Sequence, residues 1–324
     1  MKRLAYATLL ALAATATAQT PLTSEPEFMR FGCGDLKWRC GLMMSKVDNN
    51  AQAVLFVPDA GWTGDVFMAR HDFAPGWVRR ANEWGYNAFC YSSVGTGHAD
   101  VPPSDDLHML SKMNTQGTYQ ASMACGPTLL VADGLGAAYV LKARTFDPSV
   151  CKVLALIDPM PPQGVGPTPK FTLAGLRAER ERLDERLWVE WGIGPKSGKS
   201  YSDSDIGAEG YARLLERYER NQPAYWAAVQ TGFDGDVRIR DASKLAGLPV
   251  LIVGTPRRSS EQRQREDALV KWLAAQGCAV EQIELDERDL GNVGGLPMVG
   301  DRANEVLDLI IRWSQGHQPP KSEG

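Results

Sequence analysis

Short, continuous apolar runs recur along this chain, and glycine-containing loops and helix-like segments separate them. These runs cover residues 53–57, 87–91, 128–132, 153–157, 249–253 and about 280–285. Strands that are apolar along their whole length are buried on both faces, which is typical of parallel sheets. Helical patterns fall at residues 77–84, within 114–124, and at 136–144, 261–276 and about 304–313. This alternation predicts an α/β fold, with a mostly parallel central sheet and helices on both faces.

The alternation of strand and helix patterns stops between about residues 172 and 232. The sequence there is charged, helical in pattern and rich in tryptophan, as in ERERLDERLWVEW. We expect a helical lid insertion over the sheet, whose Trp188, Trp191 and Trp226 either line an apolar pocket or pack the insertion onto the sheet. One domain then spans residues 19–316, and residues 317–324 form a flexible tail.

The first residues have the pattern of a secretory signal. Lys2 and Arg3 precede an apolar stretch at residues 4–14, which is too short to span a bilayer. Ala16-Thr17-Ala18 is a small-x-small cleavage site, so the signal peptide should cover residues 1–18. No later segment is apolar enough to cross a membrane. We therefore expect a secreted protein with no membrane contact in its mature form.

Charge, cysteine spacing and glycine spacing exclude several classes of function. The formal net charge is −4, without the clustered basic residues of a nucleic-acid binder. Of six cysteines, Cys33 and Cys40 lie close together and favour a local disulfide, whereas Cys90, Cys151 and Cys278 lie on or beside apolar runs and should be buried. No zinc spacing, G-x-G-x-x-G or Walker lysine motif occurs, so neither a metal nor a cofactor is expected.

Five pieces of this sequence follow one another in the order of a known family. They are PDAGWTGDVF, APGWVRRANEWGYNAFCYSSVGTG, LLVADGLGAAYVLKA, ALIDPMPP and GNVGGLPMVGDRANEVLDLIIRW. Together they cover most of the mature chain, and they resemble the α/β-hydrolase superfamily, specifically its esterase-713-like branch. The resemblance implies the α/β-hydrolase fold and a Ser-His-acid triad.

The turn that should carry the serine lacks it. The motif G-x-S-x-G needs small residues on both sides of the nucleophile, and the best match is Ala132-Asp133-Gly134-Leu135-Gly136. Gly134 thus occupies the nucleophile position, and a glycine has no side chain with which to attack a carbonyl. A rival register would make Asp133 the nucleophile, but its flanks, Val131 and Leu135, are too bulky for the turn.

The histidine of the triad is missing as well. The family places it in a loop before the last helix, which here reads GNVGG at residues 291–295. The chain has four histidines, His71, His98, His108 and His317, and none lies in that loop. Asp158 matches the acid of the family. It either serves as a general base or hydrogen-bond acceptor, or caps the loop before Pro159.

The loop after the first core strand departs from the family too. Asp59-Ala60-Gly61 replaces the usual His-Gly, and Asp59 would place negative charge where an oxyanion forms. We expect Asp59, Gly61, Trp62 and Leu135 to contact the substrate. His98 follows the second core strand and is either a proton-transfer residue or an exposed loop histidine.

These departures favour a non-hydrolytic enzyme. A turn without its nucleophile, a tryptophan-rich lid and a pocket carboxylate are compatible with cyclisation or isomerisation of a small apolar molecule, as in secondary-metabolite biosynthesis. The candidate catalytic groups are Asp158, Asp133 and His98. One alternative is a non-catalytic binding protein. Another is an esterase or lactonase with a displaced nucleophile at Ser92, Ser93 or Ser122. The oligomeric state is left open.

Overall fold

The computed structural model describes residues 26–33, 38–59, 62–70, 74–96, 99–100, 109–166, 237–256, 258–285, 290, 297–300 and 302–318. Several sequence predictions therefore lie outside the described residues. They concern the signal segment at 1–18, the insertion at 172–232, the loop at 291–295, and the two candidate site residues Gly61 and His98.

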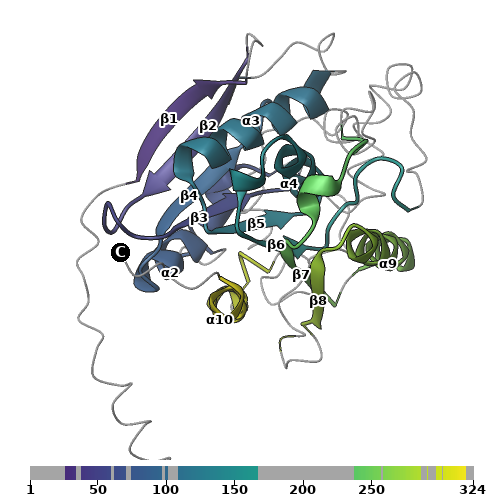
Figure 1. Ribbon diagram of the computed structural model, residues 1–324. Coiled ribbons are helices and arrows are strands. Elements are labelled where there is room, and N and C mark those ends of the chain that lie inside the picture. The colour runs from purple at the N-terminus through teal and green to yellow at the C-terminus, as the bar shows by residue number, and fades with distance from the viewer. Residues whose placement is uncertain are drawn as a thin grey trace, which may run out of the picture.

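One sheet forms the centre of the described part of the chain, with the strand order β1-β2-β4-β3-β5-β6-β7-β8 (Figure 1). Its strands are β1 (Glu27–Gly32), β2 (Arg39–Ser45), β3 (Ala53–Val57), β4 (Asn87–Ser92), β5 (Leu129–Asp133), β6 (Val153–Ile157), β7 (Pro249–Gly254) and β8 (Ala279–Glu284). The pairs from β4 to β8 are all parallel, whereas β1 and β2 pair antiparallel at one edge. The predicted parallel core is confirmed.

Helices cover both faces of this sheet (Figure 1). The longer ones are α2 (Trp77–Glu83), α3 (Leu110–Cys125), α4 (Gly136–Phe146), α9 (Ser260–Ala275) and α10 (Ala303–His317). Short 3-10 turns occur at η1 (Gly64–Phe67), η3 (Pro148–Val150) and η4 (Ser243–Leu245). The helix expected within 114–124 is longer than predicted, since it begins at Leu110.

Alternate residues of each core strand pack into two separate apolar clusters. On β5, Leu130 and Ala132 join the cluster that includes residues of α3, α4 and α9, whereas Leu129 and Val131 join the one that includes residues of α2 and α10. Every residue of β3, β4, β5 and β6 is buried. The continuous apolar runs in the sequence follow from this, because both faces of each strand need apolar side chains.

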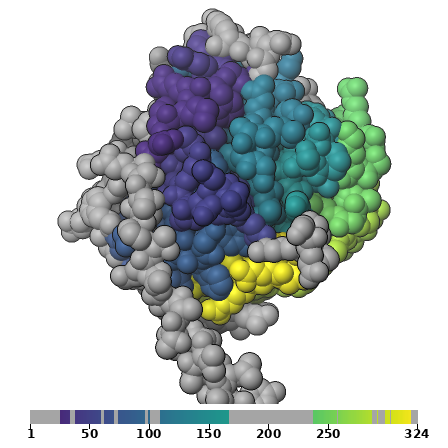
Figure 2. Space-filling model, turned by 60° about the vertical axis from the view of Figure 1, so that its left-hand side comes forward, coloured from purple at the N-terminus to yellow at the C-terminus, as the bar shows by residue number. Residues whose placement is uncertain are grey.

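Polar contacts within an aromatic core connect α2 and α10, the helices on one face of the sheet. The indole of Trp77 on α2 donates a hydrogen bond of 2.7 Å to the carbonyl of Ala303 on α10 and stacks near Phe67. Arg80 forms paired hydrogen bonds of 2.7 and 2.6 Å with Asp308 of α10. Figure 2 shows the yellow surface of α10 directly below the blue surface of the α2 region.

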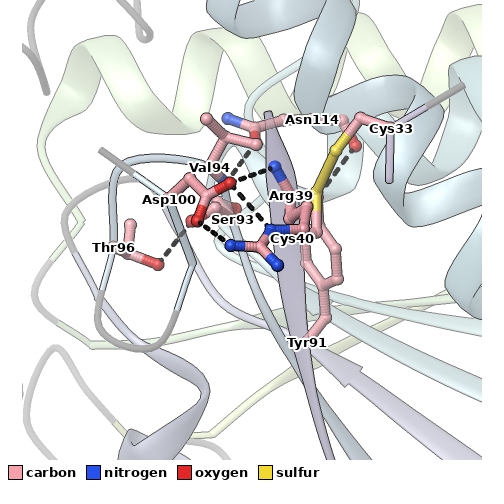
Figure 3. The surroundings of a disulfide bond; sticks show 9 residues. All are labelled: Cys33, Arg39, Cys40, Tyr91, Ser93, Val94, Thr96, Asp100 and Asn114. Atoms are coloured by element: carbon pink, nitrogen blue, oxygen red, sulfur yellow. Dashed lines mark hydrogen bonds and ion pairs between the residues drawn. A yellow bond between two sulfur atoms is a disulfide. The ribbon is translucent and has the colours of Figure 1, made fainter. Parts of the chain in front are cut away.

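The antiparallel edge holds the predicted disulfide. Cys33 follows β1, Cys40 lies on β2, and the two are bonded across a sequence separation of 7 (Figure 3). Beside the disulfide, the Asp100 carboxylate accepts hydrogen bonds of 2.9 and 3.1 Å from the backbone N–H and Nε of Arg39. This pair connects the edge to the loop after β4.

Two further predictions concern the remaining cysteines and the end of the chain. Cys90, Cys151 and Cys278 are buried and unpaired, as expected for small apolar residues. α10 runs to His317, the first residue of the predicted tail, and Gln318 accepts a hydrogen bond of 2.9 Å from Gln52. Within the described residues, none of the helices combines the length and apolarity needed to span a bilayer.

Candidate functional site

Polar residues collect at the carboxyl edge of the sheet, where four neighbouring strands end. Asp59 follows β3, Asp133 is the last residue of β5, Asp158 follows β6 and Thr255 follows β7. Since β3, β5, β6 and β7 are adjacent in the sheet, these residues lie at one edge. Ligands of open α/β sheets bind at this edge. We therefore treat it as the candidate site.

The chain turns sharply between β5 and α4, and Gly134 stands at the turn. Gly134 has a φ of +49°, in the left-handed region that glycine adopts without penalty. Its N–H donates a hydrogen bond of 3.0 Å to the carbonyl of Ile157, and its carbonyl accepts one of 2.8 Å from the N–H of Met160. The neighbouring β6 and its following loop thus hold the turn from both sides.

The carboxyl group of Asp59 lies against the Cα atom of Gly134. A Cβ atom built on Gly134 would overlap Cγ and Oδ1 of Asp59 and would lie 2.7 Å from its Cβ. Asp59 Oδ1 also accepts a hydrogen bond of 2.6 Å from the N–H of Leu135. The space that a side chain at position 134 would enter is therefore taken by a carboxylate from the loop after β3.

Asp133 is the buried carboxyl group of the site, with 5% of its surface exposed. Burial, and then the charges of Asp59 and Asp158, hold the pKa of Asp133 well above its ordinary value. A hydrogen bond from Gly134 acts in the opposite direction. Both causes favour the protonated form of Asp133, because ionising it would place like charges together away from water.

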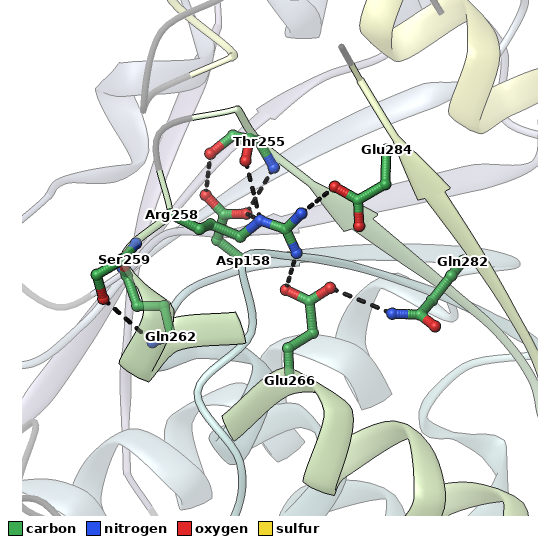
Figure 4. A network of polar contacts seen from close by, with 8 residues as sticks. All are labelled: Asp158, Thr255, Arg258, Ser259, Gln262, Glu266, Gln282 and Glu284. Carbon is green, nitrogen blue, oxygen red and sulfur yellow. Dashed lines mark hydrogen bonds and ion pairs between the residues drawn. The ribbon is translucent and has the colours of Figure 1, made fainter. Parts of the chain in front are cut away.

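Asp158 is held by β7 and the loop after it (Figure 4). Its carboxylate accepts a hydrogen bond of 2.8 Å from the Thr255 N–H and a short one from the Thr255 hydroxyl, and lies 3.5 Å from Nε of Arg258. Burial raises the pKa of Asp158 to about 7, although the contacts with Thr255 and Arg258 lower it. Its φ of +40° is the only positive value among the described non-glycine residues.

Arg258 connects Asp158 to two further carboxylates. Its guanidinium is 3% exposed and bonds to Glu266 of α9 at 2.5 Å and to Glu284 of β8 through a short contact (Figure 4). Three carboxylates therefore surround one cation, and the third, Asp158, has the raised pKa. These contacts connect the end of β6 to β7, β8 and α9. Asp158 therefore helps to hold these elements together and also has a raised pKa.

The predicted substrate-contact residues differ in their surroundings. Trp62 is buried in the apolar cluster on the α2 and α10 face, and its N–H donates a hydrogen bond of 3.2 Å to the Asp59 carbonyl. The side chain of Leu135 is buried in the opposite cluster, and its backbone N–H donates a hydrogen bond to Asp59 Oδ1. Among the predicted residues that are described, Asp59, Asp133, Leu135 and Asp158 come together, while Trp62 packs in the core.

The three serines considered as displaced nucleophiles are buried. Ser92 Oγ accepts a hydrogen bond of 3.1 Å from the N–H of Gly64, and Ser122 Oγ donates one of 2.8 Å to the Thr118 carbonyl. Ser93 lies in the turn after β4, where its carbonyl accepts from Thr96. His317, the one histidine among the described residues, pairs with Glu281 instead.

Two residues of the site were missed in the sequence. Thr255 directly follows an apolar strand, as Asp158 does, and this shared position could have indicated that the two meet. Arg258 carries no comparable signal, because its partners Glu266 and Glu284 belong to different elements. Only the folded arrangement brings these charges together.

Comparison with known proteins gives matches of structure but not of sequence. No family model and no curated protein matches the chain. A thermophilic esterase from Thermogutta terrifontis is 13% identical with a TM-score of 0.58, over 90% of this chain and 100% of that one. The 2-hydroxy-6-oxo-6-phenylhexa-2,4-dienoate hydrolase of Rhodococcus sp. strain RHA1 is 14% identical with a TM-score of 0.55, over 89% of this chain and 99% of that one.

A bacterial esterase solved at atomic resolution gives a similar result, with 11% identity, a TM-score of 0.54, and coverage of 91% of this chain and 94% of that one. At such low identity the likeness concerns the fold. The chain has the α/β-hydrolase fold, as the order of its motifs predicted. In that fold the turn after β5 is where the nucleophile stands, which gives Gly134 and Asp59 their significance.

Proposed function

We propose that this chain is a non-hydrolytic enzyme on the α/β-hydrolase fold, which isomerises or cyclises a small apolar molecule by proton transfer at carboxyl groups. Gly134 holds the nucleophile position, so the covalent acyl-enzyme route has no attacking atom there. The expected absence of the histidine from residues 291–295 removes the base that such a route needs.

The observation that carries this proposal is the position of Asp59. Its carboxylate fills the volume beside Gly134 and accepts the N–H of Leu135. The N–H of the residue after the nucleophile normally binds the oxyanion of an acyl-transfer intermediate. Here that donor is already bonded to the carboxyl oxygen of Asp59, so a developing oxyanion would lose it.

Proton transfer is the chemistry that the remaining groups support. Asp133 has a strongly raised pKa, and the pKa of Asp158 is raised to about 7. Carboxyl groups with raised pKa values are suited to general acid–base catalysis, because they hold a proton more readily than an ordinary carboxyl group does.

Secretion is a further part of the proposal. The signal-like residues 1–18 and the Cys33–Cys40 disulfide both support it, since such bonds persist in oxidising compartments. Expression of the full chain in a secreting host, followed by N-terminal sequencing of the product, tests this. We expect a mature chain that begins near Gln19; a product retained in the cell with Met1 intact would contradict it.

Two measurements on the mature protein test the absence of hydrolysis. We expect no stoichiometric labelling by a fluorophosphonate probe and no hydrolysis of p-nitrophenyl esters above the buffer rate. Labelling in the folded protein, mapped to Ser92, Ser93 or Ser122, would overturn the proposal in favour of a displaced nucleophile.

A metabolite screen separates catalysis from binding alone. Incubation with apolar extracts should produce a compound whose mass equals that of the one consumed, whereas hydrolysis adds the mass of water. The change should disappear with Asp133→Asn. If compounds are retained by the protein but none is converted, the chain is a binding protein and the catalytic part of the proposal fails.

A further inference from the structure

The carboxylate above the turn suggests which group performs the chemistry. We propose that Asp59 is the catalytic base: it enters the volume that a side chain at position 134 would fill, and there removes a proton from a carbon atom of an uncharged substrate. This inference rests on the proposed function, since it names the group that starts the isomerisation. A base from the loop after β3, Asp59, would thus act where other members of this fold have a nucleophile at the position of Gly134.

Asp59 is the carboxyl group of the site that lies beside the turn and is less buried than Asp133. Asp133 is almost fully buried, with 5% exposure. Both oxygens of Asp158 accept hydrogen bonds from Thr255, and Arg258 lies beside them. Asp59 is half-buried after β3, and its carboxyl group lies directly beside the turn at Gly134.

A backbone donor faces the carboxyl group of Asp59. Its Oδ1 accepts the N–H of Leu135 at 2.6 Å, at the start of α4, and such a donor stabilises a carboxylate. Next to it, Asp133 has a pKa well above the ordinary value, partly because of Asp59 itself. Asp59 carries the backbone donor and Asp133 is buried, so the two neighbouring carboxyl groups have different surroundings and can divide the roles of base and acid.

The charges also limit the substrate. Asp59 and Asp158 both act electrostatically on Asp133 at this edge, so an anionic substrate would bring a further negative charge next to carboxyl groups. An uncharged molecule with an acidic C–H bond fits better. The C–H bond breaks, the proton moves to Asp59, and the electron pair stays in the substrate as a shifted double bond. Return of the proton to another carbon yields an isomer and restores the carboxylate, without any oxidant or co-reactant.

A small carbon acid tests this role without knowledge of the natural substrate. The probe is 5-nitrobenzisoxazole, whose ring opens when one C–H proton is removed and whose phenolate product is followed by absorbance. The mature wild-type protein should open it faster than an equal concentration of acetate. Asp59→Asn should lose about 100-fold or more of the acceleration, the usual contribution of a general base.

Two variants control this measurement. Asp147→Asn changes a carboxylate in the loop before β6, at the opposite edge of the sheet, and should keep the wild-type rate. Gly134→Ala keeps Asp59 but pushes its carboxyl group aside, because the new Cβ overlaps Cγ and Oδ1. We expect a loss of about 10- to 100-fold from such a displacement. Circular dichroism checks that each variant is folded, and Gly134→Ala remains informative if Asp59→Asn unfolds.

The outcomes separate this inference from the proposed function. Equal rates for wild type and Asp59→Asn, or no acceleration by wild type, overturn the role of Asp59 as base. The fluorophosphonate and ester assays are unaffected by that result, so a non-hydrolytic enzyme with another base would stand. Labelling by fluorophosphonate overturns the proposed function, whatever the result with the carbon acid.

Discussion

The contact between Asp59 and Gly134 gives a prediction whose magnitude follows from the structure. In Gly134→Ala, the new Cβ atom would lie 2.7 Å from the Asp59 Cβ and would overlap its carboxyl group, at a residue whose φ is +49°. Such distances are not tolerated between non-bonded carbons. Asp59 must therefore move and give up its hydrogen bond to Leu135.

Two contributions add up to the expected loss of stability. A left-handed backbone costs a non-glycine residue about 1–2 kcal/mol. Loss of a hydrogen bond to a charged group costs about 1.5–3 kcal/mol more. Gly134→Ala should thus lower the free energy of unfolding by about 2.5–5 kcal/mol. Gly126→Ala is the matched control, because Gly126 has a φ of +56° and nothing within 4 Å of an added Cβ; it should lose only the first part.

Urea denaturation followed by tryptophan fluorescence measures these differences. A double-mutant cycle with Asp59→Gly isolates the contact, because in that background Gly134→Ala should cost about 1–2 kcal/mol, the backbone part alone. The coupling energy should then be about 1.5–3 kcal/mol, the hydrogen-bond part. If Gly134→Ala costs no more than Gly126→Ala, or the coupling is zero, Asp59 does not occupy the turn and the proposed function loses its main support.

Three further predictions concern the pH dependence and the stability of the frame. Because the folded pKa of Asp158 is raised from 3.8 to about 7, the folded state binds this proton more tightly than the unfolded chain. Its contribution to stability is therefore present at low pH and lost as pH rises through that interval; in urea titrations at several pH values, Asp158→Asn should remove a decline on the order of 4 kcal/mol at most. Trp77→Phe should lower the free energy of unfolding by about 1–3 kcal/mol, because it leaves the Ala303 carbonyl without its donor; a loss below that range would argue against this bond. Reduction of the Cys33–Cys40 disulfide, which spans a sequence separation of 7, should cost about 2–3 kcal/mol in the same assay, and a Cys33→Ser/Cys40→Ser variant should not respond to reductant.

The layered sheet and its order could be predicted because they depend on local pattern. The buried run at residues 53–57 becomes β3 with the same bounds, and the run at 153–157 becomes β6. Strands buried on both faces need unbroken apolar sequence, so the signal is written in consecutive residues. The turn at Gly134 is also local, because a strand that bends at once into a helix needs small or left-handed residues at fixed positions.

The partners of the site could not be predicted in this way. Asp59 and Leu135 are separated by 76 residues, and Asp158 and Thr255 by 97, so no spacing in the sequence connects them. From the residues alone, Asp59 was a charge in the wrong place for acyl transfer. The folded chain shows that its carboxyl group packs against the Cα of Gly134.

The sequence by itself determined the class of fold, the glycine at the turn and the aspartates that end adjacent strands. Tertiary structure decided which of those aspartates is buried, which is tied to Arg258 and which lies over Gly134 at the start of α4. The physical reason is that burial and charge–charge distance set the protonation of a carboxyl group, and both arise only when separate strands pack side by side.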